Sequence, residues 1–545
     1  MLALREDSAS NNAMPLGRQG APVAAALRRR NPGPRLGAWT LVVLLLAVAV
    51  AVGRRAGGFH DAAMDWDESL YIVMARRWLE GDLPYVAVYD LHPVGLPALI
   101  AAVTWLLGDG VIAARLTAAL AVAGTCAALF FAGARFARDR VTGAVAALLY
   151  GIYMLRPEAL APNTELYNNL LVTLAAVLLF GQAERIRAGQ QVQRTHALAA
   201  AALLGAGLQI KYVIAPEAAG FCLAFLLCWR RHGAGTGEIA RLAGGLMLAG
   251  LTPTLVVVAY FWSHGALQPY LDATIGSNLS YVAHVPNGDE ILHRVFIGFK
   301  PIALVAAGGA AALALLRRGA ASRTDRAPAP LLLRGCALWL LLAAANVVLP
   351  MKFFAHYFYA LLPPLCLLAA VLVASLRRPG WRFGLLAQVV AVLLLAAPPL
   401  RAIAREIVDP VDPLLRATEQ ATACIREHPA ARPGLYVFNW DPVLYETTRT
   451  TPPTRFVLPG ELAVYSDSAG VDAPAEIARI LAGRPGHIVV ARPSYTPFSP
   501  EAFALVDEAL AGYELACTVP FRVNVKRTAQ AFVYRAPAGA PTNAP

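Results

Sequence analysis

Charge is scarce in this chain. Only 15% of its 545 residues are Asp, Glu, Lys or Arg, whereas 57% are hydrophobic and the mean hydropathy is +0.52. A soluble protein of this length is far more polar, so the composition excludes a soluble fold and indicates many membrane spans. The net charge of +12 comes mainly from Arg in short loops between apolar runs. That pattern is typical of membrane topology signals rather than of nucleic-acid binding.

Nucleotide and metal motifs are missing as well. The sequence contains neither a Walker loop nor a dinucleotide fingerprint, so neither ATP nor an NAD-type cofactor is indicated. Its seven cysteines show no Cys-x-x-Cys pair and no Cys/His spacing of a metal site. No internal repeat is found, although repeats with matching broken helices are expected of many transporters.

Apolar runs predict about eleven membrane spans. Residues 1–36 are Arg-rich and predicted to be disordered and cytoplasmic, and we interpret the run after them as an uncleaved first span rather than a signal peptide. Val94–Leu107 is too short for the about 20 residues of a span. We interpret it as a re-entrant or interfacial helix, because the Arg clusters of later loops then all fall on the cytoplasmic side. The predicted spans are 36–52, 112–134, 141–155, 168–183, 196–213, 215–229, 241–262, 296–316, 331–350, 357–376 and 382–400.

The composition changes after the last predicted span. Residues 37–400 are expected to form the catalytic membrane domain, 401–535 a small soluble α/β domain outside the cytoplasm, and 536–545 a disordered tail. Cys424 and Cys517 lie in the polar domain, where a disulfide and two free thiols are both open. Helices are predicted at Pro413–Glu427, Pro474–Ala482 and Pro500–Tyr513, and strands at Gly434–Asn439, His487–Ala491, Ala516–Val525 and Ala529–Arg535.

The stretch Asp65–Pro93 concentrates acidic residues in a chain that is otherwise mostly apolar. Carboxylates beside a membrane are costly unless they have a partner or a task. Asp67 and Glu68 are the candidates for acid/base chemistry on an incoming hydroxyl or amine, and Ser69–Leu79 is predicted to be a helix on the membrane surface. The structural alternative is helix capping or a salt bridge to Arg76 or Arg77. The six acids of the stretch are Asp65, Asp67, Glu68, Glu80, Asp82 and Asp90.

The predicted topology brings polar residues that are distant in sequence to the non-cytoplasmic face. A lipid-phosphate leaving group needs cations to stabilise its developing charge. The outward cation candidates are Lys211, Lys352, His356, Arg156 and His92, and the outward acid candidates are Asp67, Glu68 and Glu165. For Glu165, a helix cap or a pair with Arg156 is the alternative; for Lys211, Lys352 and His356 it is anchoring at the membrane interface. Arg115 is a candidate buried partner for one of the acids.

The acidic stretch resembles the opening of bacterial GT-C glycosyltransferases related to the protein O-mannosyltransferases and the lipid A aminoarabinose transferase. The likeness rests on Asp67-Glu68, then Tyr71 and Ala75, Gly81, Pro93, Gly108 and Ala114-Arg115-Leu116. Gly205–Pro216 and Phe353–Pro363 are similar to later family segments, and Tyr436–Thr447 is similar to extracytoplasmic domains of bacterial members. Many relatives have Lys-Pro-Pro where this chain has His92-Pro93-Val94.

The resemblance implies a polytopic α-helical membrane enzyme of GT-C type in the bacterial inner membrane. Its donor would be a polyprenyl-phosphate sugar, and its acceptor an extracytoplasmic lipid, glycan or protein. Asp67 would be the base, with Glu68 beside it and Glu165 as a second acid; Lys211 would contact the donor phosphate. Transfer would be a single displacement with inversion. A divalent metal held by Asp67 or Glu68 is left open, and the alternatives are a flippase, transporter or ligase of lipid-linked glycans or a membrane receptor.

Overall fold

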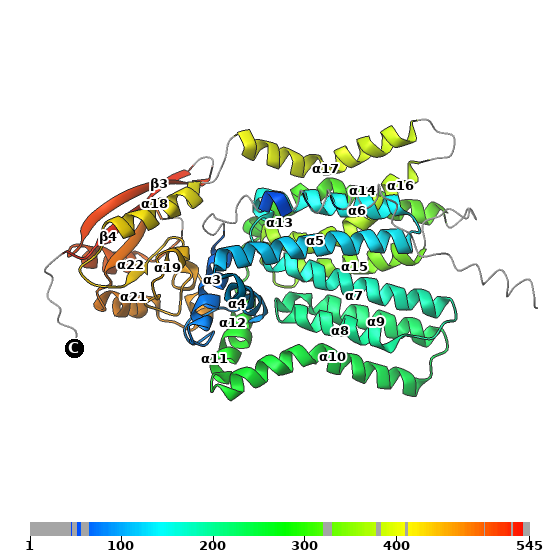
Figure 1. Cartoon of the computed structure of the whole chain (residues 1–545), viewed down its shortest axis with the longest axis horizontal. Coiled ribbons are helices and arrows are strands. Elements are labelled where there is room, and N and C mark those ends of the chain that lie inside the picture. The colour runs from blue at the N-terminus through cyan, green and yellow to red at the C-terminus, as the bar shows by residue number, and fades with distance from the viewer. Residues whose placement is uncertain are drawn as a thin grey trace, which may run out of the picture.

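A computed structural model describes residues 45, 49, 52–55, 65–319, 330–377, 383–408, 413–494, 496–524 and 527–537. The predicted N-terminal tail lies outside these residues, as do nearly all of the first span over 36–52 and most of the tail over 536–545. Two parts lie end to end along the longest axis of the molecule (Figure 1). One is a bundle of long helices, and the other is a smaller C-terminal domain with a sheet.

The helical bundle follows the predicted spans. Each of the ten predicted spans after the first overlaps at least one helix, but only eight helices of the described residues are long and apolar enough to cross a membrane, so the predicted number of spans is not confirmed. Two predicted spans, 141–155 and 196–213, form shorter helices of 14 and 15 residues, α6 and α8. The bundle helices are α5 (Gly110–Phe136), α6 (Arg140–Tyr153), α7 (Thr164–Arg187), α8 (Arg194–Leu208), α9 (Ala215–Arg231), α10 (Thr236–Ser263), α14 (Ala303–Gly319), α15 (Pro330–Val348), α16 (Leu362–Ser375) and α17 (Gly384–Val408).

Small residues and prolines shape the bundle. A Cβ on Gly205 of α8 would lie 2.0 Å from the Gly250 carbonyl oxygen of α10, so only glycine permits this close approach of two helices. Both α10 and α17 curve along the outside of the bundle (Figure 1) and contain internal prolines, Pro253 in the first and Pro398 and Pro399 in the second. Proline removes a backbone hydrogen bond and bends a helix at such positions.

Short helices fill the end of the bundle that faces the C-terminal domain (Figure 1). The predicted surface helix is α3 (Trp66–Leu79), and the predicted short helix is α4 (Gly95–Leu107). However, the middle of α3 is buried on all sides, because the C-terminal domain covers it. The other elements at this end are α11 (Leu267–Leu271), η3 (Asp272–Gly276), α12 (Ser277–Ala283), α13 (Gly288–Phe299), η4 (Lys300–Ile302), η5 (Ala355–Leu361), η1 (Pro157–Ala159) and η2 (Tyr212–Ile214).

The C-terminal domain is the predicted small α/β unit. Its four-stranded sheet has the order β1-β2-β4-β3, in which β1 and β2 are parallel and the other neighbours are antiparallel. The predicted helices and strands are all present, with ends that move by a few residues. The strands are β1 (Leu435–Val437), β2 (His487–Arg492), β3 (Glu514–Asn524) and β4 (Arg527–Arg535), and the helices are α18 (Pro413–Glu427), α19 (Val443–Thr447), η6 (Pro459–Glu461), α20 (Ser466–Ala469), α21 (Ala473–Ala482) and α22 (Pro500–Leu510).

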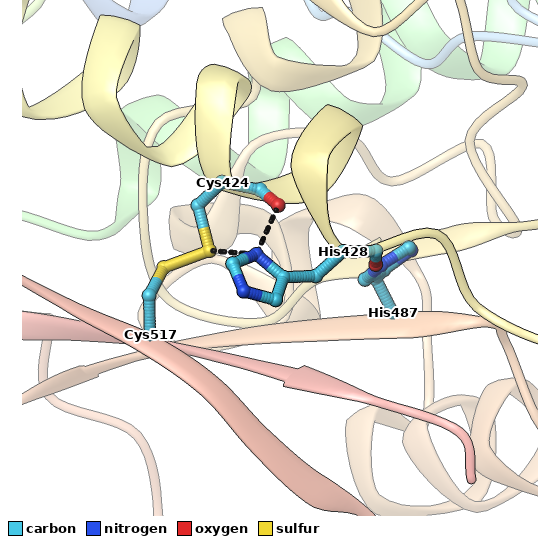
Figure 2. Close-up of a disulfide and its surroundings, with 4 residues drawn as sticks. All are labelled: Cys424, His428, His487 and Cys517. Atoms are coloured by element: carbon cyan, nitrogen blue, oxygen red, sulfur yellow. Dashed lines mark hydrogen bonds between the residues drawn. A yellow bond between two sulfur atoms is a disulfide. The ribbon is translucent and has the colours of Figure 1, made fainter.

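A disulfide joins α18 to β3. Cys424 and Cys517 are bonded across a sequence separation of 93 residues, which decides between the two alternatives left open by the sequence (Figure 2). The His428 ring lies beside the bond, with its Nδ1 atom 3.9 Å from Cys424 Sγ and 3.1 Å from the Cys424 carbonyl oxygen. The bond fixes α18 on the sheet. Disulfides of this kind persist in oxidising compartments.

Candidate active site

Asp67 lies in the first turn of α3, two residues after the N-cap residue Asp65. The Asp65 side chain accepts a hydrogen bond from Asp67 N at 3.1 Å and so starts the helix. Burial is the main cause that raises the pKa of Asp67; His92 and Lys211 oppose this shift, and Asp90 adds to it. Within the described part of the chain, the half-buried Asp67 carboxylate forms no ion pair. The Asp67 carboxylate therefore lies near His92 and Lys211 without forming an ion pair with either.

Asp65 shares this environment. Burial, followed by the charge of Asp67, raises the pKa of Asp65 to about 6, and His356 opposes the shift. His356 in η5 thus lies within electrostatic range of the start of α3, although some 290 residues separate them in the sequence. The structure brings these two predicted regions together.

Glu68 has a structural partner. The Arg115 guanidinium of α5 contacts both carboxylate oxygens of Glu68, through Nε to Oε1 and through Nη2 to Oε2 at 3.1 Å. Both side chains are 1% exposed. The prediction that Arg115 pairs with one of the acids is confirmed. Because this bidentate pair occupies its carboxylate, Glu68 attaches α3 to α5 rather than facing an incoming substrate.

Glu165 and Lys211 form a second buried pair. Lys211 Nζ donates to Glu165 Oε1 at 2.7 Å, and it lies 4.0 Å from the centre of the Tyr357 ring. The predicted pairing of Glu165 with Arg156 is wrong, because Arg156 pairs with Glu158 instead. Lys211 is 5% exposed, so the interpretation that it extends to the membrane interface is wrong as well.

A glycine places His92 next to this pair. Gly95 N donates to the Gln209 carbonyl oxygen at 2.7 Å, and a Cβ on Gly95 would lie 2.4 Å from that oxygen. Only glycine allows the start of α4 to approach the chain so closely, two residues before Lys211. His92 precedes this contact by three residues and therefore lies on the same side.

His92 is held by an acid that the sequence analysis did not place in the site. His92 Nδ1 lies 2.8 Å from Asp90 Oδ1, and His92 N donates to the same oxygen at 2.9 Å. Burial lowers the pKa of His92, but the Asp90 carboxylate outweighs it, and the pKa is raised overall. A carboxylate-bound imidazole that keeps its proton is a suitable cation for a phosphate group.

Lys352 lies in a separate cationic group with Arg294, which the sequence analysis missed. Lys352 Nζ contacts the His284 carbonyl oxygen and lies 4.1 Å from the centre of the Tyr281 ring, while Arg294 Nη1 donates to the Lys352 carbonyl oxygen at 2.9 Å. Burial, and then the charge of Arg294, lower the pKa of Lys352. Both neighbours of Lys352, Met351 and Phe353, have positive φ angles of 54° and 51°. Strained backbone of this kind clusters at functional sites.

A metal site gains no support from the side chains that the structure describes. Those residues contain no group of three or more His, Cys, Asp and Glu side chains arranged to hold an ion. Glu68, one of the two proposed ligands, is occupied by Arg115.

Comparisons with known proteins identify the fold. Residues 91–257, which include His92, Glu165 and Lys211, match the family model of dolichyl-phosphate-mannose-protein mannosyltransferase. The structure of ArnT from Cupriavidus metallidurans bound to undecaprenyl phosphate aligns with 92% of this chain and 99% of its own, with a TM-score of 0.59 and 15% identity. Its apo structure aligns over 91% and 97%, with a TM-score of 0.56 and 14% identity.

A more distant match has the same architecture. The apo oligosaccharyltransferase from Archaeoglobus fulgidus aligns with 83% of this chain and 69% of its own, with a TM-score of 0.52 and 12% identity. No curated protein matches the chain in sequence. Identities this low establish a shared fold and not a shared substrate. The chain therefore shares the fold of these GT-C glycosyltransferases, and its residues 91–257 are similar to the mannosyltransferase family.

Proposed function

We propose that this protein transfers a sugar from a polyprenyl-phosphate donor to an acceptor outside the cytoplasm, with Asp67 as the general base. The observation that carries the proposal is the contrast between three neighbouring acids. Glu68 and Glu165 each form a buried ion pair, whereas Asp67 forms no ion pair among the described residues and has a raised pKa. A base with a pKa moved toward neutrality is better suited to accept a proton.

The proposed reaction is a single displacement. Asp67 takes the proton of an acceptor hydroxyl or amine, whose oxygen or nitrogen then bonds to the anomeric carbon of the sugar. The bond between that carbon and the phosphate oxygen breaks, and its electron pair leaves with the polyprenyl phosphate. Attack from the face opposite the phosphate inverts the anomeric carbon.

Cations stabilise the leaving phosphate in this proposal. Lys211 and His92 lie near Asp67, and His356 lies near Asp65. Lys352 and Arg294 form the second cationic group, in which Arg294 also pairs with Glu290. Fixed cations in a buried site stabilise developing charge strongly, because no solvent must reorganise. Arg156 pairs with Glu158 and belongs to neither of these two groups of cations, so we leave it out of the phosphate site.

The donor class and the location rest on different support. ArnT, which shares the fold, was crystallised with undecaprenyl phosphate, and this supports a polyprenyl-linked donor here. The disulfide between Cys424 and Cys517 supports a C-terminal domain outside the cytoplasm, since cytoplasmic thiols are kept reduced. The multi-pass bundle would then lie in a bacterial inner membrane with its acidic end facing outward.

The test is release of sugar from a radiolabelled pool of polyprenyl-phosphate sugars by purified protein in lipid discs. Asp67→Asn is compared with wild type, and Asp82→Asn is the matched control, because Asp82 is 41% exposed and pairs with Arg77. We expect turnover by wild type and the control and none by a folded Asp67→Asn protein. Equal turnover in all three would remove Asp67 from the chemistry. Lipid movement across the membrane without sugar release would favour a flippase.

A further inference from the structure

The helix that carries Asp67 belongs to two hydrophobic cores at once. On one side, Leu70, Val73 and Met74 pack with residues of the C-terminal domain, among them Trp440 and Leu444. On the other side, its residues join the core of the helical bundle; these are Tyr71, Ile72 and Ala75. Removal or displacement of the C-terminal domain would therefore expose one whole face of α3.

Polar contacts to the C-terminal domain hold both ends of α3. Near its C-terminal end, Arg76 Nε lies 2.7 Å from Glu446 Oε2, and Arg76 Nη2 donates to the Thr450 carbonyl oxygen at 2.7 Å. In its first turn, Ser69 Oγ lies 2.8 Å from Asp441 Oδ1. Ser69 is only two residues from Asp67, so this contact restrains the turn that presents the proposed base.

Asp441 is a buried acid in the segment Asn439–Asp441 that follows β1. It is 0% exposed, and its Oδ1 atom also accepts from Val443 N at 2.9 Å. Its Oδ2 atom is buried without a hydrogen-bond partner among the described residues. An acid this deeply buried needs a specific reason to be retained, because burial of an unpaired polar group is costly.

The Ser69 hydroxyl connects Asp441 to the backbone at the start of α3. The Ser69 hydroxyl has one proton, yet it lies within hydrogen-bond distance of two acceptors, Asp441 Oδ1 and the Asp65 carbonyl oxygen at 3.0 Å. The Ser69 hydroxyl donates to Asp441 Oδ1 and can share its proton with the Asp65 carbonyl oxygen, one helical turn earlier. Burial raises the pKa of Asp441 to about 7; the hydrogen bonds from Val443 and Ser69 oppose this shift, and the nearby Glu68 and Asp65 charges add to it.

We propose that Asp441 is a positioning residue for sugar transfer, which fixes the first turn of α3 through Ser69 and thereby aims Asp67. The C-terminal domain is then a working part of the active site and not only an accessory for acceptor recognition. This inference rests on the proposed role of Asp67 as base. Its physical basis is that a displacement of a catalytic group by about 1 Å lowers the rate roughly 100-fold.

The test uses Asp441→Ala, the conservative Asp441→Asn, Ser69→Ala and the double variant Ser69→Ala/Asp441→Ala. Asp507→Ala is the control, because Asp507 is 54% exposed and pairs with Arg492 far from α3 in the sequence. Two quantities are measured in lipid discs: kcat and KM for the donor, and hydrogen–deuterium exchange of peptides that cover residues 65–79.

We expect Asp441→Ala to lower kcat by about 10-fold to 100-fold, to change the donor KM little, and to speed exchange in the first turn of α3. Asp441→Asn should retain most of kcat, because the amide oxygen can also accept the hydrogen bond from Ser69. The double variant should lose no more kcat than the more damaging single variant, because both substitutions remove the same contact.

Unchanged kcat and unchanged exchange in Asp441→Ala would overturn the inference, as would additive losses in the double variant. Equal loss in Asp441→Asn and Asp441→Ala without faster exchange would also overturn it. If wild type transfers no sugar, the proposed function fails. Exchange then still decides whether Asp441 restrains α3, because that measurement does not depend on turnover.

Discussion

Lys211 Nζ and Glu165 Oε1 lie 2.7 Å apart, and both side chains are buried. The pair joins the start of α7 to the chain just after α8. A buried ion pair contributes little net stability as a pair, but loss of one partner leaves an uncompensated charge. The structural role of the pair and the proposed contact of Lys211 with phosphate can therefore be tested separately, by removing one partner or both.

Lys211→Met should therefore be doubly harmful. It leaves Glu165 charged and buried, which costs about 3–5 kcal/mol of stability, and it removes a proposed phosphate contact. In Lys211→Met/Glu165→Gln, the thermal midpoint should recover while turnover remains low. The midpoint is followed in detergent and turnover in lipid discs. Recovery of turnover together with the midpoint would show that Lys211 acts only as the partner of Glu165.

Glu68 and Arg115 make a contrasting pair, because we place neither in contact with substrate. Glu68→Gln weakens the bidentate contact and leaves Arg115 without its buried counter-charge, so we expect a clear fall in the thermal midpoint. Protein that remains folded should keep turnover within a few-fold of wild type. Complete loss of turnover in folded Glu68→Gln protein would show that Glu68 takes part in the reaction.

Secondary structure was largely predictable from the sequence, and side-chain partners were not. Long apolar runs and the alternation of strands with helices depend on local pattern, which explains the agreement for α7, α18 and β2. The topology argument also placed Asp67, Glu165 and Lys211 at one end of the bundle. A pair with the nearby Arg156 was an alternative for Glu165, whereas the fold supplies Lys211, 46 positions further on.

Most of the contacts that the sequence analysis did not predict join segments that are far apart in the chain. Ser69 and Asp441 are 372 positions apart, and their contact depends on how the C-terminal domain packs on α3. Arg294 reaches the backbone of Lys352 from α13 in the same way. A sequence pattern reports the face on which a residue lies, but it does not report which residue of another segment that face will meet.

Glu217 gives a prediction inside the bundle. Its Oε1 atom accepts from Trp339 Nε1 at 2.8 Å and its Oε2 atom from Asn346 Nδ2 at 2.5 Å, so it joins α9 to α15. Glu217→Ala leaves both buried donors unsatisfied and should lower the thermal midpoint clearly, since each such donor costs about 1–3 kcal/mol. Glu217→Gln keeps one acceptor and should be milder. Equal midpoints for both variants would contradict this role.

The disulfide gives a prediction for the C-terminal domain. Cys424→Ser/Cys517→Ser opens a bond with a sequence separation of 93, and loss of a loop constraint of this size costs about 4 kcal/mol. We expect faster proteolysis of the C-terminal domain and, because α3 packs on this domain, lower turnover. Cys228→Ser is the control, since Cys228 is a free thiol of the bundle. Unchanged proteolysis and turnover would show that the bond is dispensable.

Asp441 should give the protein a pH-dependent stability with a defined sign. Its pKa is about 7 in the folded chain and about 3.8 when unperturbed, so the folded state holds this proton over a range in which the unfolded state has lost it. The contribution of this proton to the stability of the fold is therefore fully present below about pH 4. It is lost as the pH rises from about 4 to 7 and changes no further above about pH 7.

Asp441→Asn removes this titration and keeps a hydrogen-bond acceptor for Ser69. The slope of the thermal midpoint against pH between about 4 and 7 should therefore be smaller in Asp441→Asn than in wild type. Asp65, whose pKa is raised to about 6, retains part of the slope in both proteins. The two are compared in one detergent at constant ionic strength, with Asp507→Asn as the control. Identical slopes would mean that the protonation of Asp441 does not differ between the folded and the unfolded protein, which would contradict its raised pKa.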